Sequence, residues 1–249
     1  MTIRTTILGA LMGAALLATP AAAQQVFSWD YDTAPTLGPF PMVGYATTDS
    51  GGGVSGSQAL PGFGTSFFHN ATSGLSTLTL TGLGAHTSLT LSFDVAFIDT
   101  WDGNDVAICC NPDYLFVTRD GNPLLTLSSN NQQGLFPDYQ GGVEYGRDLY
   151  YRDPDPSGDT NTYTDVVVHF TGLTFAHTGS TFTLGFQAGG VGWQGDGNPL
   201  DESWGVDNIV VNAGTGVVPE PAAWGLMLLG FGGVGAVLRR RRWVEQALS

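Results

Sequence analysis

The chain has 249 residues, of which 42% are apolar and only 12% are charged, and its formal net charge is −14 at pH 7. It contains no lysine. Between residues 24 and 218, three arginines (Arg119, Arg147 and Arg152) stand against 20 acidic residues, which gives this segment a formal charge of −17. Because such a surface repels phosphate backbones, we expect no nucleic-acid binding; it favours divalent cations instead.

Residues 1–23 have the organisation of a secretory signal peptide. Arg4 precedes an eleven-residue apolar run that begins at Ile7, and a proline and the small residues Ala21-Ala22-Ala23 follow. This pattern predicts export through the Sec machinery, with cleavage before Gln24. The alternative, an N-terminal membrane anchor, is disfavoured because eleven apolar residues are too few to cross a bilayer, which needs about 20.

The segment from residue 24 to residue 217 has the two-residue periodicity of β-strands. The clearest strand covers residues 89–98, where large apolar side chains occupy every second position. The tripeptide Asp120-Gly121-Asn122 separates two strand patterns and predicts a hairpin. We therefore predict an all-β, two-sheet antiparallel jelly-roll sandwich, with residues 129–163 as a long loop. The other expected strands are 26–31, 40–47, 64–69, 77–81, 114–119, 123–128, 165–171, 181–186 and 205–212.

Residues 91–103 and 201–211 resemble an early core strand and the closing strand of jelly-roll modules, a group that includes concanavalin-like, MAM-like and carbohydrate-binding domains. The resemblance implies that the two strands share a structural calcium (Ca²⁺) site, because carboxylate oxygens at strand ends suit this ion. The alternative is that these aspartates cap turns and face water. The candidate ligands are Asp94, Asp99, Asp102 and Asp207.

No catalytic motif is present: the sequence lacks a Gly-x-Ser-x-Gly elbow and a His-Glu-x-x-His zinc site. We expect a non-catalytic surface or matrix protein that binds glycan or exopolysaccharide. The alternative is a surface glycan hydrolase or lyase that uses a carboxylate pair. The aromatic side chains expected to stack on sugar rings are Trp101, Tyr150, Tyr151 and Trp193. For the two tryptophans, a place in the core is the other possibility.

The only two cysteines, Cys109 and Cys110, are adjacent. Export places them in an oxidising compartment, and the sequence Cys-Cys-Asn-Pro is typical of a turn in which a vicinal disulfide can form. Two reduced thiols or an intermolecular bridge are the alternatives. A structural zinc site is disfavoured because it needs three or four soft ligands.

The C-terminal stretch combines three features in a fixed order. A Pro-Glu-Pro tripeptide precedes a 17-residue uncharged run, residues 222–238, and four consecutive arginines follow. As a transmembrane helix, this run would be about 25 Å long and would span a locally thinned bilayer. The arginines would hold the end of the chain in the cytoplasm. The residues that define the arrangement are Pro219, Glu220, Pro221, Arg239, Arg240, Arg241 and Arg242.

This arrangement, over residues 218–242, resembles the PEP-CTERM sorting signal. The resemblance implies recognition by an exosortase, a membrane protease or transpeptidase of Gram-negative bacteria. It further implies a transient single-pass stay in the inner membrane, followed by release to the cell surface or extracellular matrix. Residues 243–249 form a short cytoplasmic tail, which is longer than is usual in this family. A permanent single-span anchor is the alternative.

Overall fold

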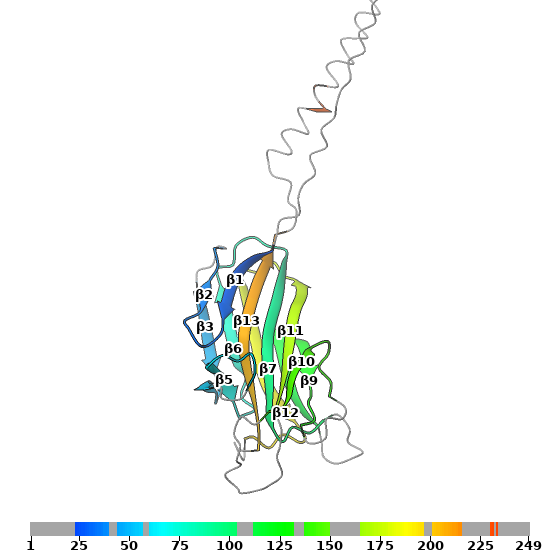
Figure 1. Ribbon diagram of the computed structural model, residues 1–249. Helices are drawn as coiled ribbons and strands as arrows, with labels where there is room; N and C mark the ends of the chain where they lie inside the picture. Colours follow the sequence, from blue (N-terminus) through cyan, green and yellow to red (C-terminus); the bar gives the residue numbers. More distant parts are fainter. Residues whose placement is uncertain are drawn as a thin grey trace, which may run out of the picture. The chain divides into compact units, whose positions relative to one another are not determined.

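The computed structural model describes residues 23–39, 44–56, 60–103, 112–131, 137–149, 165–196 and 201–215, together with residues 230, 231 and 233. Residues 22–215 make one compact unit, in which the described segments form two antiparallel sheets (Figure 1). The expected all-β sandwich is therefore confirmed. None of the described residues belongs to a helix long and apolar enough to cross a membrane. The expected signal peptide up to residue 22 lies outside the described residues, as does the sorting tripeptide with its arginines.

The larger sheet, sheet A, has eight strands in the order β10-β11-β7-β13-β1-β2, with β5 beside β13 and β4 beside β5. Its strands are β1 (Gln24–Trp29), β2 (Thr36–Leu37), β4 (Gly53–Gly56), β5 (Ser66–Asn70), β7 (Ser88–Asp99), β10 (Val143–Leu149), β11 (Asp165–Ala176) and β13 (Glu202–Gly214).

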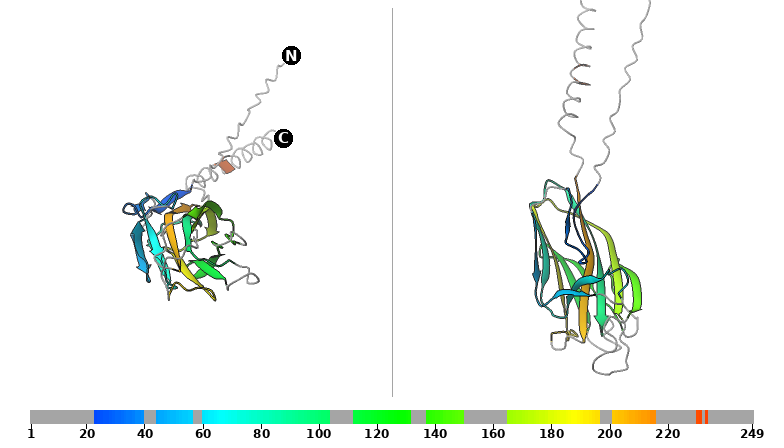
Figure 2. Two further views of the ribbon diagram at one scale, coloured as in Figure 1. Left: turned by 60° about the horizontal axis from the view of Figure 1, so that its bottom comes forward. Right: turned by 60° about the vertical axis from the view of Figure 1, so that its left-hand side comes forward.

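The smaller sheet, sheet B, has five strands in the order β3-β6-β12-β8-β9 and packs face to face with sheet A (Figure 2). Its strands are β3 (Gly44–Asp49), β6 (Ser76–Thr81), β8 (Asp113–Arg119), β9 (Asn122–Leu127) and β12 (Thr181–Gly190).

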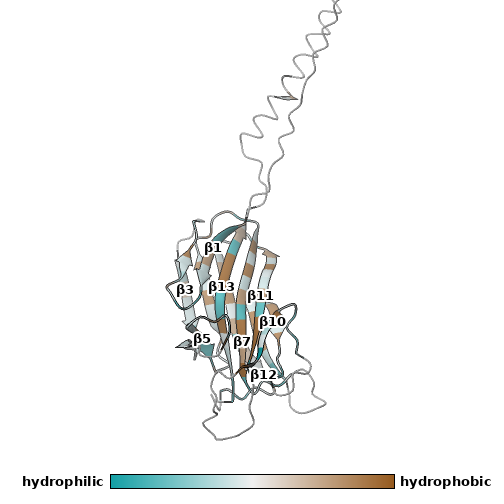
Figure 3. Cartoon of the chain, viewed as in Figure 1, coloured by the Kyte–Doolittle hydropathy of each residue, from teal (hydrophilic) through white to brown (hydrophobic). Residues whose placement is uncertain are grey.

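Alternating apolar residues of both sheets fill the space between them. Phe93, Val95 and Phe97 of β7 point into this core, as do Leu184 of β12 and Val211 of β13, and all five are completely buried. The alternation along β7 and β13 is visible as bands of opposite hydropathy in Figure 3. Burial of these side chains is the main driving force for the sandwich, because each contributes about 1.5–3 kcal/mol when removed from water.

A second, smaller apolar cluster lies on the outer face of sheet A. Phe63 and Phe67 cover Ala96 and Ile98 of β7, together with Val167 of β11. The sequence pattern predicts that every second residue of β7 faces water, and for the second half of this strand that prediction is wrong. The reason is tertiary: Phe63, which precedes β5, and Phe67, which belongs to it, pack over the outer face of the sheet there.

Three strands lie where none was expected. β2 and β4 are short, and β10 falls in the segment that we interpreted as a loop. β10 pairs only with β11 and is an edge strand of sheet A. Its sequence, VEYGRDL, lacks clean alternation because its side chains are largely exposed, so the pattern that marks half-buried strands is absent.

The expected hairpin is confirmed between β8 and β9. Its two central residues, Asp120 (φ 49°) and Gly121 (φ 73°), both have left-handed backbone conformations, as a type I′ turn requires. A Cβ atom at Gly121 would have no heavy atom within 4 Å, so the constraint at this position is conformational and not steric crowding by neighbours.

We predict that Gly121→Ala lowers the free energy of unfolding by about 1 kcal/mol, because the left-handed conformation is less favourable for alanine than for glycine. The matched control is Gly53→Ala: its Cβ also meets open space, but its backbone conformation is an ordinary one. The control should be neutral or slightly stabilising. Urea denaturation measures both, and equal losses in the two variants would contradict the conformational explanation.

Candidate functional site

Three carboxylates meet at the end of the sandwich where β7 ends and where β8 and β13 begin. Asp102 follows β7, Asp113 is the first residue of β8 and Glu202 is the first residue of β13. One oxygen of each carboxylate lies within 4.8 Å of those of the other two. We call these three residues the carboxylate cluster. It connects the two sheets, because β7 and β13 belong to sheet A whereas β8 belongs to sheet B.

Backbone amides hold the carboxylate cluster in place. The amide of Asp102 donates a hydrogen bond to Asp113 Oδ2 (2.8 Å), and the amide of Asp113 donates in return to the carbonyl oxygen of Asp102 (3.0 Å). The amide of Gln194 donates to Glu202 Oε2 (2.5 Å). Beneath the cluster, the buried Trp101 indole donates to the carbonyl oxygen of Ser203 (2.7 Å), which fixes the start of β13.

Two members of the carboxylate cluster are almost completely buried, and Asp102 is partly buried. Asp113 is 0% exposed and Glu202 is 1% exposed. Burial, together with the nearby negative charges of Asp102 and Asp201, raises the pKa of Asp113 to about 7. Burial and the charges of Asp113, Asp201 and Asp102 raise the pKa of Glu202 to about 8. Burial also raises the pKa of Asp102, with a contribution from Asp201. Ionisation of these carboxylates therefore destabilises the folded protein unless a positive charge compensates them.

A second polar group lies on the outer face of sheet A, where Asp94 of β7 is directly opposite Asp207 of β13. The Asp94 carboxylate contacts His169 Nδ1 of β11 through one oxygen and accepts a hydrogen bond from Asn208 Nδ2 (2.8 Å) through the other. A bulge in β13 follows Asp207, and Asn208 adopts a left-handed conformation (φ 52°) within it. The bulge brings Asn208 back toward Asp94, whereas Ile209 returns to the core.

Asp207 is almost completely buried, at 1% exposed. Burial is the largest cause that raises its pKa, to about 8, and the charges of Asp94, Asp32 and Asp30 act in the same direction. The backbone amide of Asn208 donates to Asp207 Oδ1 (2.7 Å) and offsets part of the effect. Asp207 is therefore protonated in the folded protein over a pH range in which an exposed aspartate is charged.

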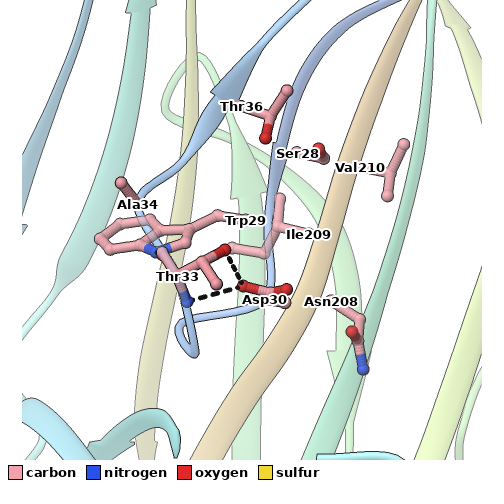
Figure 4. Close-up of a pocket in the computed structure, with 9 residues that line it drawn as sticks. All are labelled: Ser28, Trp29, Asp30, Thr33, Ala34, Thr36, Asn208, Ile209 and Val210. Atoms are coloured by element: carbon pink, nitrogen blue, oxygen red, sulfur yellow. Dashed lines mark hydrogen bonds between the residues drawn. The ribbon is translucent and has the colours of Figure 1, made fainter. Parts of the chain in front are cut away.

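A pocket of about 200 Å³ opens beside the loop between β1 and β2 (Figure 4). Figure 4 shows the Trp29 indole beside Thr33 and Ala34 of that loop, with Asp30 accepting hydrogen bonds from the amide and hydroxyl of Thr33 (both 3.1 Å). Ser28, Thr36 and Asn208 add further polar groups to the lining.

The Trp29 ring belongs to a group of partly buried aromatic side chains. It stacks on Tyr31 with a centroid separation of 4.1 Å and meets the exposed Tyr45 ring edge-on at 6.0 Å. The Trp29 indole nitrogen donates to the carbonyl oxygen of Thr33 (3.1 Å), which fixes the orientation of the ring. The pocket thus combines an oriented aromatic wall with hydroxyl and carboxylate groups, the usual composition of a site for a small polar ligand.

The four aspartates expected to bind calcium are divided between two places. Asp94 and Asp207 lie together on the outer face of sheet A, opposite each other in register. Asp102 belongs to the carboxylate cluster, and Asp99 is opposite Glu202 in register. Sequence reasoning missed Asp113 and Glu202. For Glu202 the composition gave a signal, because it is one of only two glutamates between residues 24 and 217.

The side chains expected to stack on sugar rings differ in where the structure places them. Trp101 is completely buried, so the prediction of an exposed ring is wrong for this residue, and its alternative place in the core is the observed one. Trp193 is partly buried and packs edge-on against Trp101 at 5.5 Å. Tyr150 and Tyr151 lie outside the described residues, as do Cys109 and Cys110. Trp29 was not among the predicted residues, because only the fold brings its ring beside Tyr45 of β3.

Comparison with known protein families finds the PEP-CTERM protein-sorting motif at residues 217–242. This match confirms the sorting signal expected from the Pro-Glu-Pro tripeptide and the arginine run. The chain is therefore an exosortase substrate. No curated protein matches the sequence. The family match covers the sorting tail alone and carries no information about the role of the sandwich.

We predict that Asp207→Asn stabilises the protein relative to the parent, and that this gain in stability grows as the pH rises. In the unfolded chain Asp207 has the ordinary pKa of 3.8, whereas in the folded chain its pKa is about 8. The folded state then holds a proton that the unfolded state has released, so this group lowers stability progressively between about pH 4 and pH 8. Asparagine, which does not titrate, removes this penalty.

Melting temperatures of both proteins between pH 4.5 and pH 8.5 test the prediction. The difference between variant and parent should be small at the acidic end and should grow in favour of the variant toward pH 8. The same exchange at the exposed Asp49 is the control for the loss of one carboxylate. A difference that stays constant over the whole range would show that Asp207 does not titrate with a raised pKa.

Proposed function

We propose that this exosortase-sorted surface protein is a non-catalytic module whose sandwich binds neutral glycan at the pocket beside Trp29. The sorting motif accounts for export to the cell surface. The observation that supports glycan binding is the pocket itself, in which the oriented Trp29 ring adjoins hydroxyl and carboxylate side chains. A sugar ring presents apolar C–H faces and polar hydroxyl edges, and an aromatic wall with hydrogen-bonding groups complements both.

The charge of the protein indicates which glycans suit this pocket. The exported segment has a formal charge of −17, and Asp30 adds a carboxylate to the lining of the pocket. A polymer that carries carboxylate or sulfate groups would be repelled by this surface, whereas an uncharged polysaccharide would not. Neutral glycan is therefore the ligand class that we propose, and exopolysaccharide of the surrounding matrix is its source.

The alternative, a hydrolase or lyase, has weaker support from the geometry. A glycosidase needs two carboxylates about 5 Å or more apart, with the sugar between them. In the carboxylate cluster one oxygen of each residue lies within 4.8 Å of those of the other two, and the side chains of Asp113 and Glu202 are almost inaccessible. Such an arrangement suits an ion better than a sugar ring, and we therefore propose that the protein is not an enzyme.

Replacement of Pro219, Glu220 and Pro221 by alanine should abolish processing. We expect the parent protein to appear in the extracellular fraction in a shortened form, whereas the variant stays in the membrane fraction at full length. Immunoblots of both fractions measure the distribution. Glu245→Gln, beyond the arginine run, serves as the control and should be processed normally. Normal release of the triple-alanine variant would contradict recognition at this tripeptide.

Trp29→Ala should weaken binding to neutral polysaccharide by about 2- to 12-fold, since the stacking contribution of one aromatic ring is about 0.5–1.5 kcal/mol. The probes are a β-glucan, a xylan and a galactan, each cast into a native gel for affinity electrophoresis of the full-length protein. Trp29→Phe keeps an aromatic ring and should retain most of the binding.

Tyr145→Ala removes an exposed aromatic side chain outside the pocket and is the matched control. It should bind as the parent does. Circular dichroism checks that Trp29→Ala remains folded, because the ring also packs against the core. Retardation of the folded Trp29→Ala variant equal to that of the parent, on a polysaccharide that retards the parent, would refute the assignment of the pocket.

A further inference from the structure

The carboxylate cluster places three formal negative charges around one point. Asp102 and Asp113 are 11 residues apart, whereas Glu202 lies 89 positions after Asp113, so its meeting with them depends on the fold and not on a local turn. Asp201 lies close enough to raise the pKa of all three and adds a fourth negative charge. Like charges at this spacing repel one another strongly in a buried environment.

The described residues provide no side-chain cation for this charge. Of the two arginines that the structure describes, Arg147 forms an ion pair with Glu144 (2.7 Å), and Arg119 lies over the Phe175 ring at 4.6 Å from its centroid. The ion pairs found among the described residues involve none of the three carboxylates. Within the described part of the chain, protonation or a bound ion is what can compensate these charges.

Two buried oxygens of the cluster have no hydrogen-bond partner among the described residues. They are Asp113 Oδ1 and Glu202 Oε1, and their side chains are 0% and 1% exposed. In each carboxylate the other oxygen accepts a backbone hydrogen bond, so the side chain is held in one orientation with its second oxygen available. Buried polar atoms without partners are uncommon in folded proteins, and two of them in one acidic cluster indicate a place where water or an ion can bind.

The geometry of the cluster fits a hard divalent cation. Calcium takes oxygen ligands at 2.3–2.6 Å, so two oxygens bound to the same ion are at most about 5.2 Å apart. The three carboxylate oxygens meet this requirement, because they all lie within 4.8 Å of one another. The described group contains no histidine or cysteine, which disfavours zinc and other soft metals.

We propose that Asp102, Asp113 and Glu202 bind a calcium ion that joins the two sheets at this end of the sandwich. The ion supplies the positive charge that the described residues lack and gives Asp113 Oδ1 and Glu202 Oε1 a partner. It also ties the residue after β7 to the first residues of β8 and β13, and so bridges sheet A and sheet B. The remaining coordination positions of calcium are filled by water or backbone carbonyl groups.

The test uses the full-length protein, purified in detergent, stripped with EDTA and dialysed free of the chelator. Isothermal titration calorimetry with calcium chloride should show one site with a Kd of about 10⁻⁴–10⁻³ M, the range of extracellular modules. Saturating calcium should raise the melting temperature by about 5 °C. Magnesium at the same concentration should give a clearly smaller rise, because it demands a tighter octahedral site.

The double variant Asp113→Asn, Glu202→Gln separates loss of the site from loss of the fold. Without calcium it should be at least as stable as the parent, because the substitutions remove two buried carboxylates whose ionised forms repel each other. With calcium, its melting temperature should not change, and its affinity should be at least about 100-fold weaker. Asp207→Asn, another buried carboxylate outside the cluster, is the matched control and should keep the full calcium response.

Either of two outcomes would overturn the proposal: no heat of binding with the parent protein, or an unchanged calcium response in the double variant. An equal response to magnesium and calcium would overturn the choice of ion. The experiment contains no polysaccharide, so its result does not depend on the proposed glycan pocket.

Discussion

The pairing of β7 with β13 is the interaction on which the rest of the structure depends. The two strands lie side by side in the middle of sheet A, from Glu202 opposite Asp99 to Gly214 opposite Ser88. One face of this pair supplies the centre of the main core, and the other face carries the smaller cluster around Phe67. Asp94 and Asp207 are paired in this ladder, and Glu202 is paired with Asp99 at its end, so its register decides where these carboxylates lie.

In both the Asp94–Asp207 pair and the carboxylate cluster, burial makes negative charge unfavourable. The two groups differ in how that charge can be compensated. At Asp207, one buried carboxylate lies beside Asp94, which a histidine and an asparagine hold in place. Protonation of Asp207 is then sufficient to relieve the repulsion. In the carboxylate cluster, three acids lie close to Asp201, and the described hydrogen bonds to Asp113 and Glu202 come from backbone amides. Protonation of one member leaves several charges uncompensated, so a divalent ion is the more effective partner.

Local sequence patterns were sufficient to predict the elements whose structure is decided locally. The alternation in residues 89–98 and the Asp120-Gly121 turn specify a strand and a hairpin within a few residues, and both are observed. The sorting tail is also a local signal. In contrast, the carboxylate cluster joins Asp113 to Glu202 across 89 positions of sequence. No pattern within a single segment indicates that these two side chains meet, because their meeting follows from strand order and register.

The sorting signal and the proposed calcium site together suggest why so acidic a domain is compatible with a stable fold. Four of the eight arginines lie in the sorting tail, so processing leaves a domain in which acids greatly outnumber bases. Self-repulsion then opposes the compact state, most strongly where carboxylates are buried. A calcium site of millimolar affinity remains unfilled at submicromolar calcium and fills where calcium is abundant. On this view, stabilisation by the ion is gained only after export, at the location that the sorting tail specifies.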